Sequence, residues 1–136
     1  PVQLAKLNEL NTRRRAITTK YRAALEKHSD VLQMQYVQEG HEHSYYGFGI
    51  IIKHDATFVR KEMMEFLEER GIETRALFGG CLPDQPGFRN ALGRSVGDLP
   101  TSRWIRDNCF FIGCHPALTD EHVQRVLVGF EEFLTR

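Results

Sequence analysis

The sequence lacks the features that mark several large classes of protein. Its longest apolar run, Phe48–Ile52, is far shorter than the roughly 20 residues that a transmembrane helix needs. The first 15 residues hold no continuous apolar stretch of the kind found in signal peptides. Lysine plus arginine and aspartate plus glutamate number 18 each, so net charge favours neither nucleic acid nor an acidic membrane as a partner. Three irregularly spaced cysteines are typical of reduced thiols, and we expect a cytoplasmic protein.

Neither proline nor glycine occurs between Val2 and Glu39, so no helix breaker lies there. Apolar residues recur at roughly helical spacing, namely Leu4, Leu7, Leu10, Ile17, Tyr21, Ala24 and Leu25. This pattern predicts one long helix over residues 2 to about 28. Because the helix would begin at Pro1 without a capping residue, we expect that further chain preceded it.

The other elements predict an α+β fold within the 136 residues of one domain. Strands are expected at Val31–Val37, Tyr45–Lys53, Glu73–Phe78 and Asp107–Cys114, the last centred on Cys109–Ile112. The unbroken Ile50–Ile52 indicates burial on both faces and a central place in the sheet. We therefore expect a small, mostly antiparallel sheet with packed helices. We expect residues 1–30 to form a long helix that leads into an α+β domain of residues 31–136.

Two shorter helices carry recognisable end signals. Asp55 or Thr57 is predicted to cap a helix that runs to about Arg70, and Gly71 to end it in the left-handed conformation. Its inward residues are Phe58, Met63, Phe66 and Leu67. Thr119 is predicted to cap the last helix. Its apolar stripe is Val123, Val126, Leu127, Phe130 and Leu134.

The stretch Gly71–Phe88 holds the most distinctive loop of the chain. Its conformationally special residues are Gly79, Gly80, Pro83 and Pro86. Glycines permit close approach, and prolines restrict the loop to few shapes. Such a loop at a strand end is a common binding element, and a tight structural turn is the alternative. The following Phe88–Leu99 has weak signals and is predicted to hold one short helical turn.

Chemistry is not visible from the residue pattern. Glu73, Arg75 and Asp84 are a candidate set for orienting an anion through the planar guanidinium of Arg75, and a surface strand of alternating charge is an equal alternative. The glycines fit no dinucleotide or P-loop fingerprint. Trp104 is interpreted either as an interface anchor or as a partly buried packing residue.

Metal-like and nucleophilic clusters are incomplete. His41–His43 and the set of Cys109, Cys114 and His115 lack the matching second half of a zinc site, so we expect no metal. Surface histidines and core cysteines are the favoured interpretation. Cys81 lies in the glycine loop, but no residue is marked as its base.

Aromatic and basic clusters are predicted to be structural. Tyr45, Tyr46 and Phe48 are interpreted as strand and core residues. Arg13–Arg15 would spread around the long helix and form a solvated face.

Several short motifs nevertheless occur in a familiar order. They are Ser44–Phe48, Gly71–Gly80, Gln85–Pro86, Gly97–Pro100 and Phe110–Gly113, followed by Pro116–Thr119. Together they resemble the C-terminal part of the DegT/StrS family of PLP-dependent sugar aminotransferases over nearly the whole chain. The similarity is greater to the branch of nucleotide-sugar 3-dehydrases that act on 4-keto-6-deoxyhexoses.

The resemblance implies a small domain of a fold-type I PLP enzyme, separated from its large domain. In that family the large domain holds the phosphate loop of the PLP or PMP cofactor, the acid that pairs with the pyridine nitrogen and the Schiff-base lysine. A catalytic histidine replaces this lysine in the 3-dehydrases. None of these groups is placed on residues 1–136, so no catalytic residue is assigned to this chain.

What the resemblance carries over is a set of loop residues. Phe78 matches a position near the cofactor, where a ring without a titratable proton suits the dehydrase branch. Arg75, Gly79, Gly80 and Gln85 are expected to shape the substrate-binding end of the site. Three departures affect this expectation: Cys81 stands where the family is expected to have asparagine, Gly79 where it has alanine, and Phe111 where it has tryptophan.

The implied reaction is C3 deoxygenation of a nucleotide-linked 4-keto-6-deoxyhexose, as in deoxysugar and lipopolysaccharide O-antigen biosynthesis. Expected partners are the nucleotide sugar, a second copy in a homodimer and a reductase. Two alternatives remain: a PLP-dependent nucleotide-sugar aminotransferase, and a non-catalytic binding domain that stands alone. Cys81, Cys109 and Cys114 do not resemble a set of iron–sulfur ligands.

Overall fold

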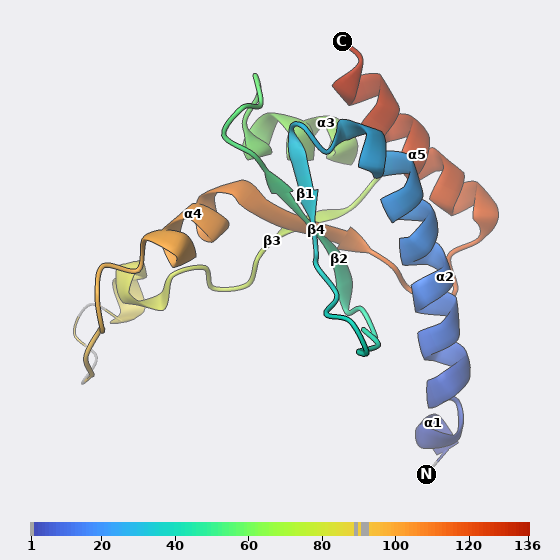
Figure 1. The fold of residues 1–136 in the computed structure, drawn as a ribbon, viewed down its shortest axis with the longest axis horizontal. Helices are drawn as coiled ribbons and strands as arrows, with labels where there is room; N and C mark the ends of the chain where they lie inside the picture. Colours follow the sequence, from blue (N-terminus) through green and yellow to red (C-terminus); the bar gives the residue numbers. More distant parts are fainter. Residues whose placement is uncertain (1, 89, 91–92) are drawn as a thin grey trace.

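The chain folds into one antiparallel sheet with helices (Figure 1). The computed structural model describes residues 2–88, 90 and 93–136. The elements are α1 (Val2–Ala5), α2 (Leu7–Leu25), η1 (Glu26–His28), β1 (Leu32–Met34), β2 (Gly47–Ile52), α3 (Arg60–Glu69), β3 (Thr74–Ala76), η2 (Leu82–Asp84), η3 (Pro86–Phe88), α4 (Pro100–Asn108), β4 (Cys109–Gly113) and α5 (Asp120–Leu134). The strand order is β1-β2-β4-β3 and each neighbouring pair is antiparallel. The predicted α+β class is confirmed.

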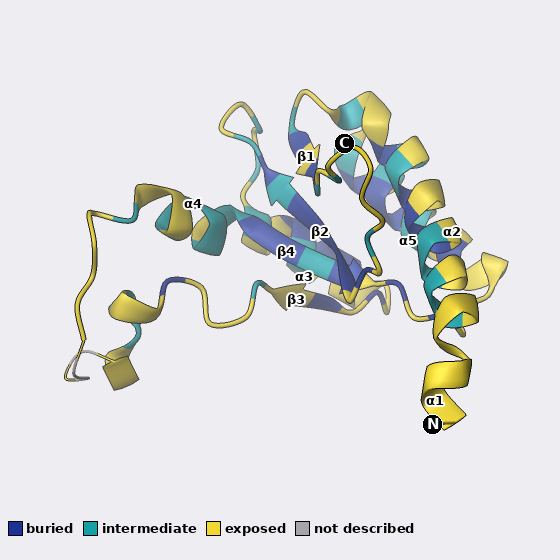
Figure 2. Ribbon diagram, turned by 60° about the horizontal axis from the view of Figure 1, so that its bottom comes forward, coloured by how far each residue is buried: buried dark blue, intermediate teal, exposed yellow. Residues whose placement is uncertain are grey.

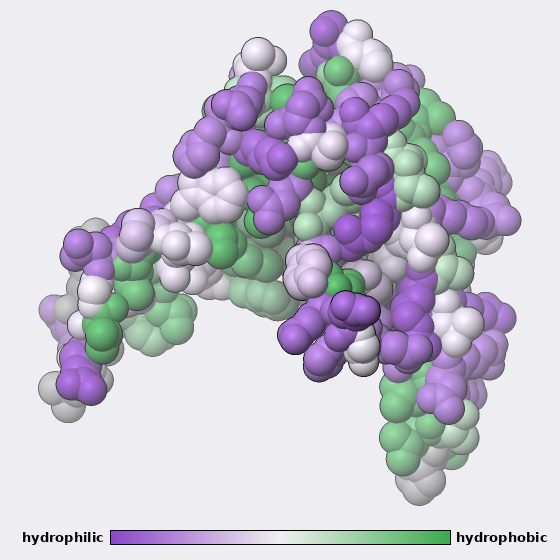
Figure 3. Space-filling view, in the orientation of Figure 1, coloured by the Kyte–Doolittle hydropathy of each residue, from purple (hydrophilic) through white to green (hydrophobic). Residues whose placement is uncertain are grey.

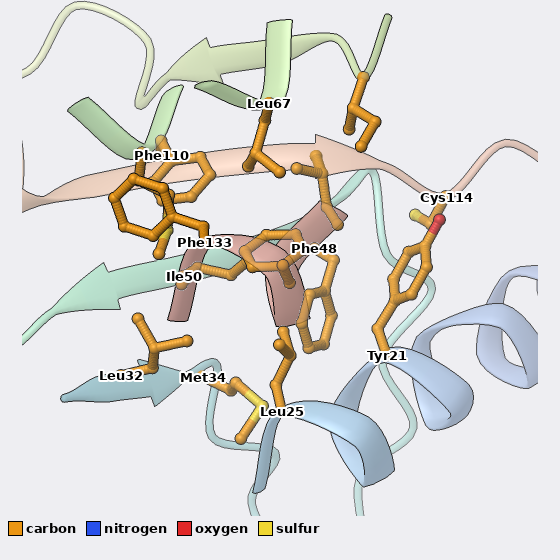
Figure 4. Close-up of a cluster of buried hydrophobic side chains, with 14 of the residues drawn as sticks. Tyr21, Leu25, Leu32, Met34, Phe48, Ile50, Leu67, Phe110, Cys114 and Phe133 are labelled. Atoms are coloured by element: carbon orange, nitrogen blue, oxygen red, sulfur yellow. The ribbon is translucent and has the colours of Figure 1, made fainter. Parts of the chain in front are cut away.

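A single core lies between the sheet and the helices α2, α3 and α5. Helices α2 and α5 run side by side, and α3 packs next to α5 (Figure 1). Fully buried side chains from both layers meet there, including Tyr21, Leu32, Phe48, Ile50, Met63, Leu67, Phe110, Ile112 and Phe130. Figure 4 shows these layers in contact, with the side chains of Phe48 and Ile50 extending from β2 into the space between the sheet and the helices. Burial of each such side chain contributes roughly 1.5–3 kcal/mol.

The two inner strands are the ones with the most apolar sequences. Strand β2 pairs with β1 on one side and with β4 on the other, as Ile50–Ile52 predicted. Within this run Ile50 and Ile52 are buried, whereas Ile51 is half-buried on the opposite face. All four strands are shorter than predicted, and two residues of the predicted last strand, Asp107 and Asn108, belong to α4.

The left-handed end of α3 is confirmed, but its predicted cap is wrong. Gly71 has φ +72°, and the Ile72 N–H donates to the Leu67 carbonyl at 3.0 Å, so the helix ends in a Schellman motif. At the other end the cap is neither Asp55 nor Thr57. The helix begins after Val59, whose backbone N–H donates to the Glu62 carboxylate at 2.9 Å.

Helix α5 begins where predicted. The Thr119 hydroxyl accepts a hydrogen bond from the His122 N–H at 3.3 Å. Val123 and Phe130 of the predicted stripe are buried, and Val126, Leu127 and Leu134 pack at its margin. The sequence pattern missed Gly129, where a Cβ would lie 2.6 Å from the Ile72 side chain. Glycine therefore allows α5 to approach the end of α3 and the residue that follows its left-handed turn.

The long N-terminal helix forms largely as predicted, with a break at Lys6 between α1 and α2 and a 3-10 turn at its end. Arg13 pairs with Glu9 on the surface, as expected of a solvated face. Arg14 does not fit that prediction. Its side chain is half-buried and its Nη1 donates to the Tyr45 carbonyl at 2.7 Å, which ties the helix to the chain before β2.

Helix α4 was not predicted. Leu99 adopts a left-handed conformation with φ +51°, and Pro100 then starts the helix. Trp104 in this helix is half-buried, with its ring centroid 5.5 Å from that of His54, which supports the packing interpretation. The helical turn predicted in Phe88–Leu99 corresponds in part to η3, which ends at Phe88; residues 89, 91 and 92 lie outside the described residues.

The strands and the segment before α4 differ greatly in burial. Figure 2 shows β2 and β4 mostly buried, whereas the chain that leads from β3 to α4 is mostly exposed. We call residues 79–99 the arm. Within the described parts of the chain, no helix combines the length and apolar character needed to cross a bilayer.

Candidate functional site

Three aromatic side chains from separate segments meet on the sheet face opposite the core. They are Tyr46 before β2, Phe78 after β3 and Phe111 on β4, and we call them the aromatic cluster. The ring centroids are 6.0 Å apart for Tyr46–Phe78, and 5.8 Å apart for each ring with Phe111. Tyr46 is 70% exposed and Phe78 is 75% exposed. The prediction that Tyr46 belongs to the core is wrong, and it is confirmed for Tyr45 and Phe48.

The sheet register places Phe111 at the centre of this face. It lies opposite Gly49 of β2 and Arg75 of β3, and it alternates with core residues on either side because strand side chains alternate between faces. A Cβ at Gly47 would lie 2.4 Å from the Phe111 ring. The ring can therefore lie across β2 only because residue 47 has no side chain.

The backbone of Phe78 is held in an unfavourable conformation. Its φ is +38°, in the left-handed region, which costs a residue other than glycine roughly 1–2 kcal/mol. The exposed ring gains little from burial in return. Strained, exposed residues of this kind are found most often where the side chain serves a ligand or a partner.

The arm is attached to α4 by an ion-pair cluster of Asp84 with two arginines. Arg103 donates to both Asp84 carboxylate oxygens, at 2.8 and 2.9 Å, and Arg106 donates to one of them at 2.5 Å. The Arg103 hydrogen bonds, together with those of Arg106, lower the pKa of Asp84 to about 2. Arg106 also binds Asp107 through two hydrogen bonds. Figure 3 shows apolar atoms on this arm beside the hollowed underside of the molecule.

The candidate set of Glu73, Arg75 and Asp84 is not assembled. Arg75 instead donates two hydrogen bonds to the carboxylate of Glu73, just before its own strand, at 2.6 and 2.8 Å, and these hydrogen bonds raise the pKa of the arginine. Asp84 is engaged by α4. The alternative of a charged surface strand describes Glu73 and Arg75 correctly.

The three other loop residues predicted to bind substrate lie together. The Gln85 amide donates to the Gly79 carbonyl at 2.7 Å and closes the loop on itself. Gly80 has φ +62°, and a Cβ there would lie 2.5 Å from the Arg106 side chain. These contacts fix the loop that follows Phe78, and Arg75 lies on the neighbouring strand beside Phe111.

Thiols and metal-like clusters do not form a site among the described residues. Cys81, Cys109 and Cys114 are buried and free, and burial raises the pKa of Cys109 and of Cys114. No group of three or more histidine, cysteine or carboxylate side chains within the described ranges is arranged to hold a metal ion. The buried position of Cys81 does not suit a nucleophile.

Four lysines that could form a Schiff base each bind another group of the chain. Lys20 binds Asp120, Lys27 binds Glu131, Lys61 binds Glu65, and Lys53 donates to the Ser29 carbonyl. The aromatic cluster itself offers flat, uncharged rings and no amine. The cluster therefore fits one wall of a cofactor site, and the Schiff-base residue would have to come from another part of the protein.

Comparison with known families decides what kind of protein this is. Residues 1–131 match the DegT/DnrJ/EryC1/StrS aminotransferase family. The chain belongs to this PLP-dependent family. It is 36% identical over 131 residues to the lipopolysaccharide biosynthesis protein RfbH of Salmonella typhimurium, a match that covers 96% of this chain and 30% of that protein. It is 37% identical over 93 residues to a dTDP-4-dehydro-2,6-dideoxy-D-glucose 3-dehydratase of Saccharopolyspora spinosa, covering 68% of this chain and 20% of that enzyme.

Solved structures of the family share the fold. The chain superimposes on the Escherichia coli GDP-4-keto-6-deoxy-D-mannose-3-dehydratase with bound hydrated PLP with a TM-score of 0.80 and 26% identity, over 93% of this chain and 32% of that one. The aminotransferase TlmJ of Streptoalloteichus hindustanus gives 0.83 and 27%, over 98% and 34%. The chain thus spans about a third or less of the length of these relatives, which include both dehydratases and aminotransferases.

Sequence reasoning missed Tyr46, Arg103 and Arg106. A signal for Tyr46 was present, since Gly47 next to it breaks the apolar alternation of the strand. The two arginines are three residues apart, which places them on one face of a helix, but that helix itself was not predicted.

Proposed function

We propose that this chain is the C-terminal small domain of a PLP- or PMP-dependent nucleotide-sugar 3-dehydrase. Residues 1–30 would form the linker helix and residues 31–136 the small domain. The observation that carries the proposal is the exposed and strained Phe78 within a family whose related members include two 3-dehydratases. The substrate would be a nucleotide-linked 4-keto-6-deoxyhexose, which loses its C3 hydroxyl.

The role of this chain would be to complete the cofactor site. When bound, pyridoxamine phosphate supplies the amine and the electron sink of the reaction. Phe78 would close one side of the site with a ring that neither donates nor accepts a proton, so it would not compete with the catalytic base. Tyr46 and Phe111 support that ring from the sheet. Arg75, Gly79, Gly80 and Gln85 would border the sugar end.

An aminotransferase is the alternative, favoured by one specific observation. A dTDP-4-dehydro-2,3,6-trideoxy-D-glucose 4-aminotransferase of Saccharopolyspora spinosa is 28% identical over 96% of this chain. The residue at the Schiff-base position of the full-length protein discriminates between the two reactions. Histidine there supports the dehydrase, and lysine supports the aminotransferase.

A stand-alone binding domain is less compatible with the surface of the chain. A self-sufficient domain should expose little contiguous apolar area, yet several large apolar side chains are half or more exposed near the arm and the aromatic cluster, namely Tyr46, Phe78, Leu82 and Phe88. In the proposed enzyme these side chains would contact the large domain or a second copy in a cytoplasmic homodimer. A reductase partner would complete the deoxygenation.

The test uses the full-length protein that carries this chain. It is incubated with pyridoxamine phosphate and GDP-4-keto-6-deoxymannose or a dTDP-linked 4-keto sugar, and the products are identified by mass spectrometry. Loss of the C3 oxygen is the expected result, and an amine at C4 would establish the aminotransferase instead. Phe78→Ala should reduce both cofactor affinity and rate, with Tyr36→Ala, an 81% exposed tyrosine away from the cluster, as the control. Unchanged values in Phe78→Ala would remove Phe78 from the site.

A further inference from the structure

The side chains of Tyr45 and Tyr46 lie on the opposite sides of the sheet from those that strand alternation predicts. In β2, Phe48 is buried in the core, and Gly47 lies on the outer face under the Phe111 ring. Continued to the preceding residues, this alternation would place Tyr46 in the core and Tyr45 outside. Instead Tyr45 is 7% exposed, with its ring centroid 6.4 Å from that of Phe48, whereas Tyr46 is 70% exposed and contacts Phe111. The alternation is therefore interrupted just before β2 begins.

The interruption coincides with a left-handed backbone at Tyr45. Its φ is +45°, and among the non-glycine residues that the structure describes only Phe78 and Leu99 share a positive φ. Because this conformation is unfavourable for a residue with a Cβ, the surrounding contacts must hold it in place. The chain also bends at Tyr46. The left-handed residue and the bend together turn the Tyr46 ring to the outer face, which is the face of the aromatic cluster.

Contacts hold the backbone of Tyr45 on both sides of its Cα. Its N–H donates to Nδ1 of His43 at 2.9 Å. Its carbonyl accepts two hydrogen bonds, from Nη1 of Arg14 at 2.7 Å and from the Cys114 thiol at 3.4 Å. Burial raises the pKa of the thiol, which stays protonated but is a weak donor. The guanidinium is the stronger of the two donors to this carbonyl, because it is charged.

Helix α2 holds the chain on both sides of Tyr46. Arg14 binds the carbonyl of the residue before it. Tyr21 lies two turns further along the same face of the helix, and its hydroxyl donates to the Gly113 carbonyl at 3.2 Å. Gly113 pairs across the sheet with Gly47, the residue after Tyr46. The position of α2 is thereby linked to the position of the Tyr46 ring.

We propose that Arg14 is a positioning residue, which keeps Tyr46 in the aromatic cluster by holding the Tyr45 carbonyl. Without this hydrogen bond Tyr45 can relax to an extended backbone, and strand alternation then turns the Tyr46 ring away from the outer face. The cluster would be complete only in the molecules that keep the left-handed conformation, and its apparent affinity for a ligand falls with that fraction. The proposal rests on the proposed function only for the identity of this ligand as the cofactor.

The first test compares Arg14→Met with Arg22→Met in the 136-residue chain by NMR. Arg22 is a matched control, because its guanidinium also ties α2 to a backbone carbonyl, but to that of Gln35 next to β1. Arg14→Met should lose the nuclear Overhauser contacts between the rings of Tyr46 and Phe111, together with the left-handed backbone shifts of the residue before Tyr46. Arg22→Met should keep both. Ring contacts that persist in Arg14→Met, or that vanish equally in Arg22→Met, would overturn the proposal.

Further variants at the same two positions separate the charge of the donor from the folding of the chain. Arg14→Lys keeps a cationic donor on a shorter side chain, so it should recover part of the ring contacts that Arg14→Met loses. If the methionine variants do not fold, Arg14→Gln and Arg22→Gln replace them and are judged by the same two outcomes.

The second measurement is the affinity of the full-length protein for pyridoxamine phosphate. Arg14→Met should weaken it about 10-fold, since release of an unfavourable left-handed residue depopulates the complete cluster by about that factor. The loss should be larger in affinity than in the rate at saturating cofactor, and Arg22→Met should leave the affinity unchanged. Unchanged affinity in Arg14→Met, when the same variant of the chain has lost its ring contacts, would refute the aromatic cluster as a cofactor wall and leave the positioning role of Arg14 standing.

Discussion

Replacing Phe78 with glycine should relieve backbone strain that the native residue carries. The φ of +38° lies in the left-handed region, which glycine adopts readily and which is unfavourable for a residue with a Cβ. Two variants separate the ring from the backbone. Phe78→Ala removes the ring and keeps the strain, whereas Phe78→Gly removes both.

The magnitude follows from the exposure and the dihedral angle. Because the ring is 75% exposed, its loss in Phe78→Ala should cost at most about 1 kcal/mol. A left-handed conformation costs alanine about 1–2 kcal/mol, and the greater freedom of unfolded glycine offsets less than about 1 kcal/mol of the relief. Phe78→Gly should therefore be more stable than Phe78→Ala by about 1 kcal/mol.

Urea denaturation of the 136-residue chain measures this difference, which corresponds to a shift of several degrees in Tm. The control is Ala76→Gly in β3, an exposed position outside the left-handed region, where glycine should cost about 0.5–1 kcal/mol. The sign of the alanine-to-glycine change should thus reverse between positions 76 and 78. If the change from alanine to glycine lowers the free energy of unfolding by the same amount at positions 76 and 78, Phe78 is not strained. The structural argument for its functional role then fails.

Four further predictions concern the supports of the site. Asp84→Asn should speed hydrogen exchange in residues 79–88. Because the pKa of Asp84 is lowered to about 2, the carboxylate stabilises the fold above the unfolded pKa near 4, and this stabilisation is lost as pH falls towards 2. The urea midpoint of the variant should therefore change less with pH than that of the native chain. Gly47→Ala should displace the Phe111 ring at a cost of about 1–3 kcal/mol, measured by unfolding and by loss of Tyr46–Phe111 ring contacts in NMR spectra. Tyr21→Phe should cost about 1 kcal/mol through loss of its hydrogen bond, measured by thermal unfolding. The isolated chain should turn over no nucleotide sugar, and any turnover in a coupled assay would contradict the placement of the catalytic groups outside it.

Elements with a strong local signal were predicted well. Gly71 and Thr119 mark helix ends through their own backbone and hydroxyl chemistry, and the structure confirms both. Ile50–Ile52 marks an inner strand because such a run cannot face water on both sides. These signals depend on a few neighbouring residues and can therefore be recognised in the sequence without knowledge of the tertiary structure.

The errors arose where distant contacts outweigh local preference. Helix α4 has a polar sequence with no buried residue, and it is held by its contacts with β2 and β4 and by the binding of Arg103 and Arg106 to Asp84. No periodicity within residues 100–108 contains that information. Tyr46 is similar, because the aromatic run in which it lies does not specify which ring faces the core.

The sequence by itself determined the α+β class, the antiparallel sheet, several helix ends and membership of a PLP-dependent family, since each depends on local pattern or on ordered motifs. Tertiary structure alone decided which side chains form the site. Asp84 binds α4 and not Arg75 because the arm folds back on that helix. Phe111 faces Tyr46 and Phe78 because the β2–β4 register places it opposite Gly49 and beside a glycine that leaves it room. Pairing across a sheet joins residues far apart in the chain, and only the folded register specifies which residues meet.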